Sequence, residues 1–221
     1  LTYTLCEKLN PTNCDTATIT VPVTAAPIVA TPDTLNVPNG TTGSPNAGNI
    51  IPNDTLNGTP ITVGPSGNTN ITVTTPATPL PTAPPGNTNV PVIDPNTGIV
   101  SVPPNTPAGS YPITYQICEK LNPTNCSTTT ATVVVAAPPI VAADDSYTGI
   151  NGGTGNTNVG NAVSNDTLNG SPATVGTAGN TTLTVTTPAT PISGGPVPAV
   201  DPLTGIVSVP AGTPAGVYNI G

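Results

Sequence analysis

SYPITYQICEKLNPTNCSTTTATVVV, residues 110–135, contains two runs of alternating residues separated by a turn-rich segment. Successive side chains of a strand point to opposite faces, so each run predicts a strand with one apolar face. The predicted apolar faces carry Tyr111, Ile113, Tyr115 and Ile117 in the first run and Ala131, Val133 and Val135 in the second. Cys118 and Cys126 fall on the opposite, solvent side. The stretch therefore predicts a hairpin that closes a β-sandwich with its cysteines outside the core.

The nine residues CEKLNPTNC occur twice, 112 residues apart, at Cys6–Cys14 and Cys118–Cys126. PIVA, NDTLNG and TVTTPATP recur at the same spacing, whereas DPNTGIVSVP and DPLTGIVSVP are 107 residues apart. The five-residue difference lies between residues 80 and 91, as a surface loop would allow. Such self-similarity predicts tandem repeats of about 110 residues.

The repeats predict three parts. Residues 1–25 are expected to be the C-terminal hairpin of a preceding repeat, 26–137 a complete repeat, and 138–221 a following repeat without its last hairpin. In this interpretation the chain is two periods cut from a longer array.

Short alternating runs of β-branched residues in the middle repeat predict about eight strands and no helix, which is typical of an all-β, immunoglobulin-like sandwich. The expected strands are 33–37, 48–51, 61–63, 70–75, 90–93, 99–102, 110–118 and 127–135. In the turn DPNTG, Pro95 suits a type I turn and Gly98 suits a positive φ. Tyr111 is a candidate for a tyrosine corner.

The composition disfavours several classes of function. Only 5% of the residues are charged, the net charge is −8, and the chain has no histidine and only two basic residues. Without imidazole the usual catalytic triads and zinc sites lose their central group, so we do not expect an enzyme. An acidic chain is repelled by nucleic acid and by anionic membranes. No apolar run is long enough to insert into a membrane.

The paired cysteines favour two disulfides, Cys6–Cys14 and Cys118–Cys126, because each pair can face across a hairpin. A loop this short would stabilise the fold by roughly 2.5 kcal/mol. Three alternatives stay open: a zinc site would need four thiolates together, a reactive thiol would need Lys8 or Lys120 beside it, and an isopeptide bond would need a buried lysine.

The charged residues of the two CEKLNPTNC segments are Glu7, Lys8, Glu119 and Lys120. Since the last hairpin of such a sandwich turns at the end where the first strand begins, these residues are candidates for contacts with the preceding repeat. The alternative is a solvated turn whose charges aid solubility.

Most aspartates adjoin turn residues and are expected to hydrogen-bond their own turns. Asp144 and Asp145, in VAADDSY, are the candidates for a Ca²⁺ site between repeats. No other cofactor is indicated.

With the repeat, DDSY, NDTLNG, DPxTGIVSVPxxTPAGxY and CEKLNPTNC, the chain resembles the tandem immunoglobulin-like or cadherin-like repeats of giant cell-surface proteins of Bacteroidota, including gliding-motility-associated adhesins. The run of aspartates that often follows NDT in calcium-binding repeats is missing here. The resemblance implies type nine secretion to the exterior of the outer membrane. It also implies O-glycosylation at Asp-Ser/Thr-aliphatic motifs. The matching threonines are Thr16, Thr34, Thr55 and Thr167.

Together these features predict a structural stalk or adhesive repeat region that projects a distal domain for adhesion or gliding. Its expected partners are neighbouring repeats of the same chain, with surface glycans or other cell-surface proteins as further candidates. The alternative is a subunit of an extracellular filament, in which the hairpin Leu1–Val23 completes a sandwich of a neighbouring chain by strand addition. A carbohydrate-binding module is disfavoured because aromatic platforms are nearly absent.

Overall fold

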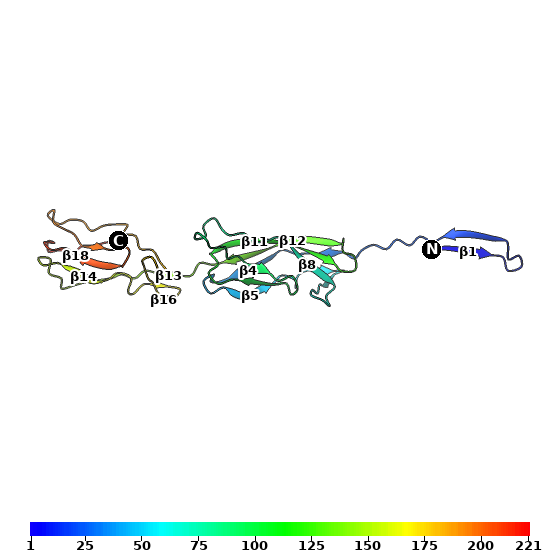
Figure 1. The fold of residues 1–221 in the computed structure, drawn as a ribbon, viewed down its shortest axis with the longest axis horizontal. Coiled ribbons are helices and arrows are strands. Elements are labelled where there is room, and N and C mark those ends of the chain that lie inside the picture. The colour runs from blue at the N-terminus through cyan, green and yellow to red at the C-terminus, as the bar shows by residue number, and fades with distance from the viewer. The chain divides into compact units, whose positions relative to one another are not determined.

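The structure, a computed structural model, describes all 221 residues and consists of strands and connecting segments without a helix (Figure 1). The all-β class predicted from the sequence is confirmed. The chain divides into two compact units, Leu1–Ala136 and Ala137–Gly221. Within the first unit, β1 (Thr2–Cys6) and β2 (Cys14–Thr18) form a separate two-stranded sheet. No helix with the length and apolarity needed to cross a membrane is present.

The remaining strands of the first unit form an immunoglobulin-like sandwich, here called the middle domain. One sheet has the order β4-β12-β11-β8, and the facing sheet has the order β5-β10-β9. A third, small sheet has the order β3-β6-β7. The strands are β3 (Ile28–Val29), β4 (Asp33–Val37), β5 (Ser44–Asn49), β6 (Thr55–Leu56), β7 (Thr59–Pro60), β8 (Thr69–Thr75), β9 (Val92–Ile93), β10 (Ile99–Val102), β11 (Gly109–Glu119) and β12 (Cys126–Val135).

The core of the middle domain lies between its two main sheets. The apolar faces predicted for β11 and β12 are buried, with Tyr115, Ile117, Ala131 and Val133 fully inaccessible to solvent. Cys118 and Cys126 lie on the opposite face and are partly exposed. The alternation of residues 110–135 therefore predicted both faces of this hairpin correctly.

Strands β4 and β10 have the predicted bounds, whereas the expected strand 61–63 does not form. Instead, TLNGTP forms the hairpin β6–β7, in which Asn57 and Gly58 have φ values of 53° and 75°. Two residues with positive φ are characteristic of a type I′ turn, for which Asn-Gly is the preferred sequence. The prediction was wrong here because it gave no weight to this turn signal.

Two predicted local features are confirmed. Gly98 has a φ of 72°, and the Asp94 side chain accepts hydrogen bonds from the Asn96 N–H at 2.9 Å and the Thr97 hydroxyl at 2.7 Å. These donors hold the pKa of Asp94 below its ordinary value, the Asn96 N–H contributing most. The Tyr111 hydroxyl donates to the Pro107 carbonyl at 2.7 Å, which is the bond of a tyrosine corner.

The second unit repeats only part of this pattern. Its strands are β13 (Ile140–Val141), β14 (Asn156–Asn161), β15 (Thr167–Leu168), β16 (Ser171–Pro172), β17 (Ala199–Val200) and β18 (Ile206–Val209). They form the sheets β13-β15-β16 and β14-β18-β17. TVTTPATP begins within β8 in the middle domain, but its second copy, from Thr184, is not a strand. β8 pairs with β11 along Thr69–Thr75, whereas Thr186 and Thr187 of the second copy are hydrogen-bonded to Gly221, which is equivalent to Thr114 of β11.

Candidate functional site

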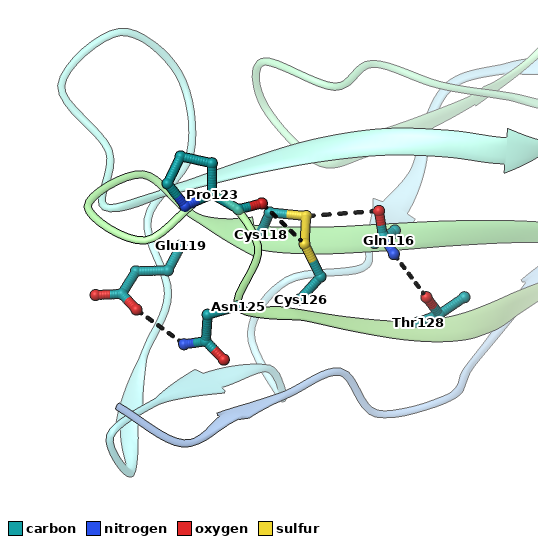
Figure 2. The surroundings of a disulfide bond; sticks show 7 residues. All are labelled: Gln116, Cys118, Glu119, Pro123, Asn125, Cys126 and Thr128. Carbon is teal, nitrogen blue, oxygen red and sulfur yellow. Dashed lines mark hydrogen bonds between the residues drawn. A yellow bond between two sulfur atoms is a disulfide. The ribbon is translucent and has the colours of Figure 1, made fainter. Parts of the chain in front are cut away.

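The closing hairpin of the middle domain is pinned by a disulfide at its turn (Figure 2). Cys118 and Cys126 are directly opposite in the β11–β12 register, with Cα atoms 4.1 Å apart. Cys6 and Cys14 form the same bond between β1 and β2. Because all four cysteines are paired, the zinc and free-thiol alternatives are excluded. The disulfide closes a short loop on the surface and does not cross between the sheets.

Inside the CEKLNPTNC turn, Glu119 is buried, so the alternative of a wholly solvated turn does not hold for this residue. It follows Tyr115 and Ile117 at the same period of two, so the alternation already indicated the core face. Its Oε2 accepts a hydrogen bond from Asn125 Nδ2 at 2.8 Å (Figure 2). The same Nδ2 group donates to the Ala26 carbonyl at 2.7 Å. The hairpin turn is therefore tied to the segment that leads into β3, as the sandwich topology predicts.

Lys120 is bound within its own domain. Its Nζ donates to the Gly64 carbonyl at 2.6 Å and to the Pro65 carbonyl at 3.2 Å. In the first hairpin, Glu7 accepts from Asn13 Nδ2 at 3.1 Å, and both Glu7 and Lys8 are exposed. The contacts of Glu119 and Lys120 thus brace the turn against its own sandwich, and contact with a preceding repeat stays a prediction.

We expect Asn125→Ala to lower the free energy of unfolding of the middle domain by about 2 kcal/mol, because buried Glu119 and the Ala26 carbonyl both lose a donor. Chemical denaturation monitored by circular dichroism measures this change. Asn13→Ala is the matched control, because Asn13 makes the equivalent bond to Glu7 at the surface. An equal effect of the two variants would contradict the role assigned to Asn125.

A buried acidic cluster, which the sequence did not predict, lies where β4, β11 and the turn after β5 meet. It is defined by Asp33, Asp54 and Tyr115. Asp54 and Tyr115 have no exposed surface, and the Tyr115 hydroxyl lies 2.9 Å from Asp33 Oδ2 and 3.2 Å from Asp54 Oδ2. The sequence interpretation treated Asp54 as a turn aspartate. The available signal was Tyr115 itself, because a tyrosine in a core strand needs a partner for its hydroxyl.

Burial raises the pKa of Asp54 from its ordinary value of 3.8 to about 6, and nearby Asp33 adds to this shift. The Thr31 N–H and the Tyr115 hydroxyl act in the opposite direction. Burial also raises the pKa of Asp33, against hydrogen bonds from Tyr115 and Asn53. The cluster therefore binds protons more tightly than exposed aspartates do.

The other predicted site residues are spread over the surface. Thr16 and Thr34 are exposed, and Thr55 and Thr167 are partly exposed. Asp144 and Asp145 are both exposed, and no group of three or more acidic, cysteine or histidine side chains is arranged to hold a metal. Partial burial raises the pKa of Asp145, and the charge of Asp166 contributes next. Calcium at Asp144 and Asp145 stays a prediction.

No protein-family model matches the sequence, and no curated protein matches it. Among solved structures, the chain is similar to the protocadherin gammaB7 EC3-6 cis-dimer structure, with 13% identity over 91% of this chain and 47% of that chain, and a TM-score of 0.34. It is also similar to protocadherin gamma B2 extracellular cadherin domains 3–6, with 12% identity over 91% of this chain and 48% of that chain, and a TM-score of 0.31. The chain spans about half the length of these cadherin structures. The likeness concerns the fold and identifies no function.

Proposed function

We propose that this chain is a non-enzymatic repeat region of a large secreted bacterial surface protein, a stalk that projects a distal domain for adhesion or gliding. In this function each repeat adds length, and the prolines between repeats stiffen the junctions. Neighbouring repeats of the same chain are the partners of each domain. The site of action is the exterior of the outer membrane.

The observation that carries the proposal is that both copies of the repeat build the same side-chain contacts. Asp54 accepts from the Thr31 N–H at 2.7 Å, and Asp166 accepts from the Ala143 N–H at 2.8 Å. The corner bond of Tyr111 recurs as a 2.8 Å bond from the Tyr218 hydroxyl to the Pro214 carbonyl. These bonds lie within single repeats, so they support a module that can be added in series.

The chemistry of the surface supports a passive, extracellular role. The cysteines are all in disulfides, which persist in oxidising surroundings. One of the two lysines is bound to its own domain, and the buried Asp54 carboxyl lies inside the sandwich.

We extend the proposal to O-glycosylation at Thr16, Thr34, Thr55 and Thr167. All four have some solvent exposure, and the first two are the most accessible. Intact-mass measurement of the secreted protein tests this modification. A mass equal to that of the polypeptide alone would contradict it.

A second candidate function, assembly by strand addition, is favoured by the first hairpin. Its apolar residues are exposed, and Tyr3, which is equivalent to Tyr115, is 48% exposed. In this second candidate function, the hairpin Leu1–Val23 of one chain pairs with a sandwich of a neighbouring chain.

Sedimentation of a longer chain, made of several complete repeats in series, distinguishes the two functions. A stalk is expected to stay monomeric at every concentration. A filament subunit is expected to exchange hairpins between chains and to form polymers that grow with concentration. If the longer chain formed polymers, the stalk proposal would be contradicted.

A further inference from the structure

The buried cluster of the middle domain contains more hydrogen-bond acceptors than donors. Four oxygens surround the Tyr115 hydroxyl: Asp33 Oδ2 at 2.9 Å, Asp54 Oδ2 at 3.2 Å, the Ile50 carbonyl at 3.3 Å and the Thr31 carbonyl at 3.5 Å. A tyrosine hydroxyl has a single proton to donate. With both carboxyl groups ionised, at most one of the two Oδ2 atoms has a donor there.

The other oxygens of the two carboxyl groups already have partners. Asp33 Oδ1 accepts from Asn53 Nδ2 at 3.1 Å, and Asp54 Oδ1 accepts from the Thr31 N–H at 2.7 Å. These donors leave the Oδ2 atom of buried Asp54 dependent on the tyrosine, while Asp33, which is partly exposed, competes for the same hydroxyl proton. A buried acceptor without a donor is costly, and a buried charge without a counterion is more costly still.

No positive charge neutralises the cluster. The chain has two lysines, no arginine and no histidine, and Lys120 binds the Gly64 and Pro65 carbonyls instead. Lys8 lies in the exposed first hairpin. The charged group that acts on Asp54 is Asp33, which has the same sign.

We propose that Asp33, Asp54 and Tyr115 form a proton-binding site that stabilises the folded middle domain in mildly acidic surroundings. A proton taken from solvent onto Asp54 Oδ2 makes that atom a donor to the Tyr115 hydroxyl oxygen. The hydroxyl can then donate its own proton to Asp33 Oδ2. One added proton thus gives each of the three groups a partner and leaves one negative charge where there were two.

The bound proton acts on the contact between the two sheets. Asp33 begins β4 and Tyr115 lies in β11, both in the four-stranded sheet. Asp54 and Ile50 belong to the turn that follows β5, a strand of the facing sheet. Loss of the proton places two like charges at this junction. The inference concerns the middle domain alone and holds for a stalk or a filament.

The sign of the pH dependence follows from the folded-state pKa of Asp54. It is raised from 3.8 to about 6, so the native domain binds this proton more tightly than the unfolded chain does. The resulting stabilisation is complete below about pH 4 and is lost as the pH rises through about 6. Exposed Asp94 has the opposite dependence, because its pKa is lowered and its stabilisation is lost on acidification.

Thermal unfolding of the full chain at pH 5.0 and pH 7.5 tests the site. We expect the midpoint of the middle domain to be roughly 5 °C higher at pH 5.0. Asp54→Asn mimics the protonated carboxyl, since it keeps Oδ1 and supplies a neutral donor, and is expected to remove most of this difference. Asp94→Asn is the control that keeps it. A wild-type midpoint equal or lower at pH 5.0 would overturn the proposal.

Carboxyl ¹³C resonances of the wild-type chain provide a second readout that does not depend on any variant folding. One aspartate is expected to titrate with a midpoint near pH 6. Titration of every aspartate below about pH 4.5, near the unperturbed value, would overturn the proposal. A result with Ca²⁺ would also overturn the proposal. If millimolar Ca²⁺ at pH 7.5 raised the thermal unfolding midpoint to its pH 5.0 value, and Asp54→Asn abolished that effect, the site would bind a cation and not a proton.

Discussion

Replacing Gly40 with alanine is expected to lower the free energy of unfolding of the middle domain by about 3 kcal/mol. A Cβ atom at Gly40 would lie 2.0 Å from the Thr106 carbonyl oxygen and 2.8 Å from a methyl group of Val135. The Thr106 carbonyl cannot easily withdraw, because the Thr106 N–H is bonded to the Gly40 carbonyl at 3.1 Å and its hydroxyl to the Pro103 carbonyl at 2.6 Å.

Gly58→Ala is the matched control for Gly40→Ala. Gly58 has a φ of 75°, and a Cβ atom added there would have no atom within 4 Å. Alanine at this position therefore incurs only the cost of a positive φ, about 1 kcal/mol. Denaturant unfolding of both variants measures the difference. The second unit repeats the close approach, with Gly152 against the Thr213 carbonyl. If Gly40→Ala lowered the free energy of unfolding no more than Gly58→Ala does, the backbone around Gly40 would have to relax, which would contradict this prediction.

Tyr115→Phe is expected to lower the free energy of unfolding by roughly 2–4 kcal/mol at pH 7.5, because the buried Asp54 carboxyl and the partly buried Asp33 carboxyl lose their shared donor. Tyr111→Phe is the control within the same strand. Tyr111 is buried to the same degree as Tyr115. Its replacement by phenylalanine removes one neutral hydrogen bond, to the Pro107 carbonyl, at a cost of about 1 kcal/mol. Equilibrium denaturation of the pair separates the loss of a hydroxyl from the loss of the acidic cluster's donor. Equal costs would contradict the contacts described for Tyr115.

The sequence predicted those parts of the fold that depend on local patterns. The alternation in residues 110–135 predicted the buried faces of β11 and β12, and Asp94 to Gly98 predicted a turn that forms as expected. These features depend on the period of two and on backbone preferences, which neighbouring residues determine.

What the sequence could not predict depends on contacts between distant segments. Asp54 is 61 residues from Tyr115, and its burial follows from how the turn after β5 packs on β11. Thr184 and its neighbours repeat the sequence of β8 yet form no strand. Thr186 and Thr187 are hydrogen-bonded to Gly221, whereas β8 pairs with β11 over its whole length. Glu119 lies between these cases, since its position in the alternation indicated burial but its charge indicated solvent.

We propose that the chain is built from repeats that fold as separate modules and extend a stalk. Small-angle X-ray scattering of chains with one, two and three complete repeats in series tests it most directly. We expect monomers whose maximum dimension rises by a similar increment with each added repeat. A maximum dimension that stops rising with repeat number, or particles heavier than one chain, would contradict it.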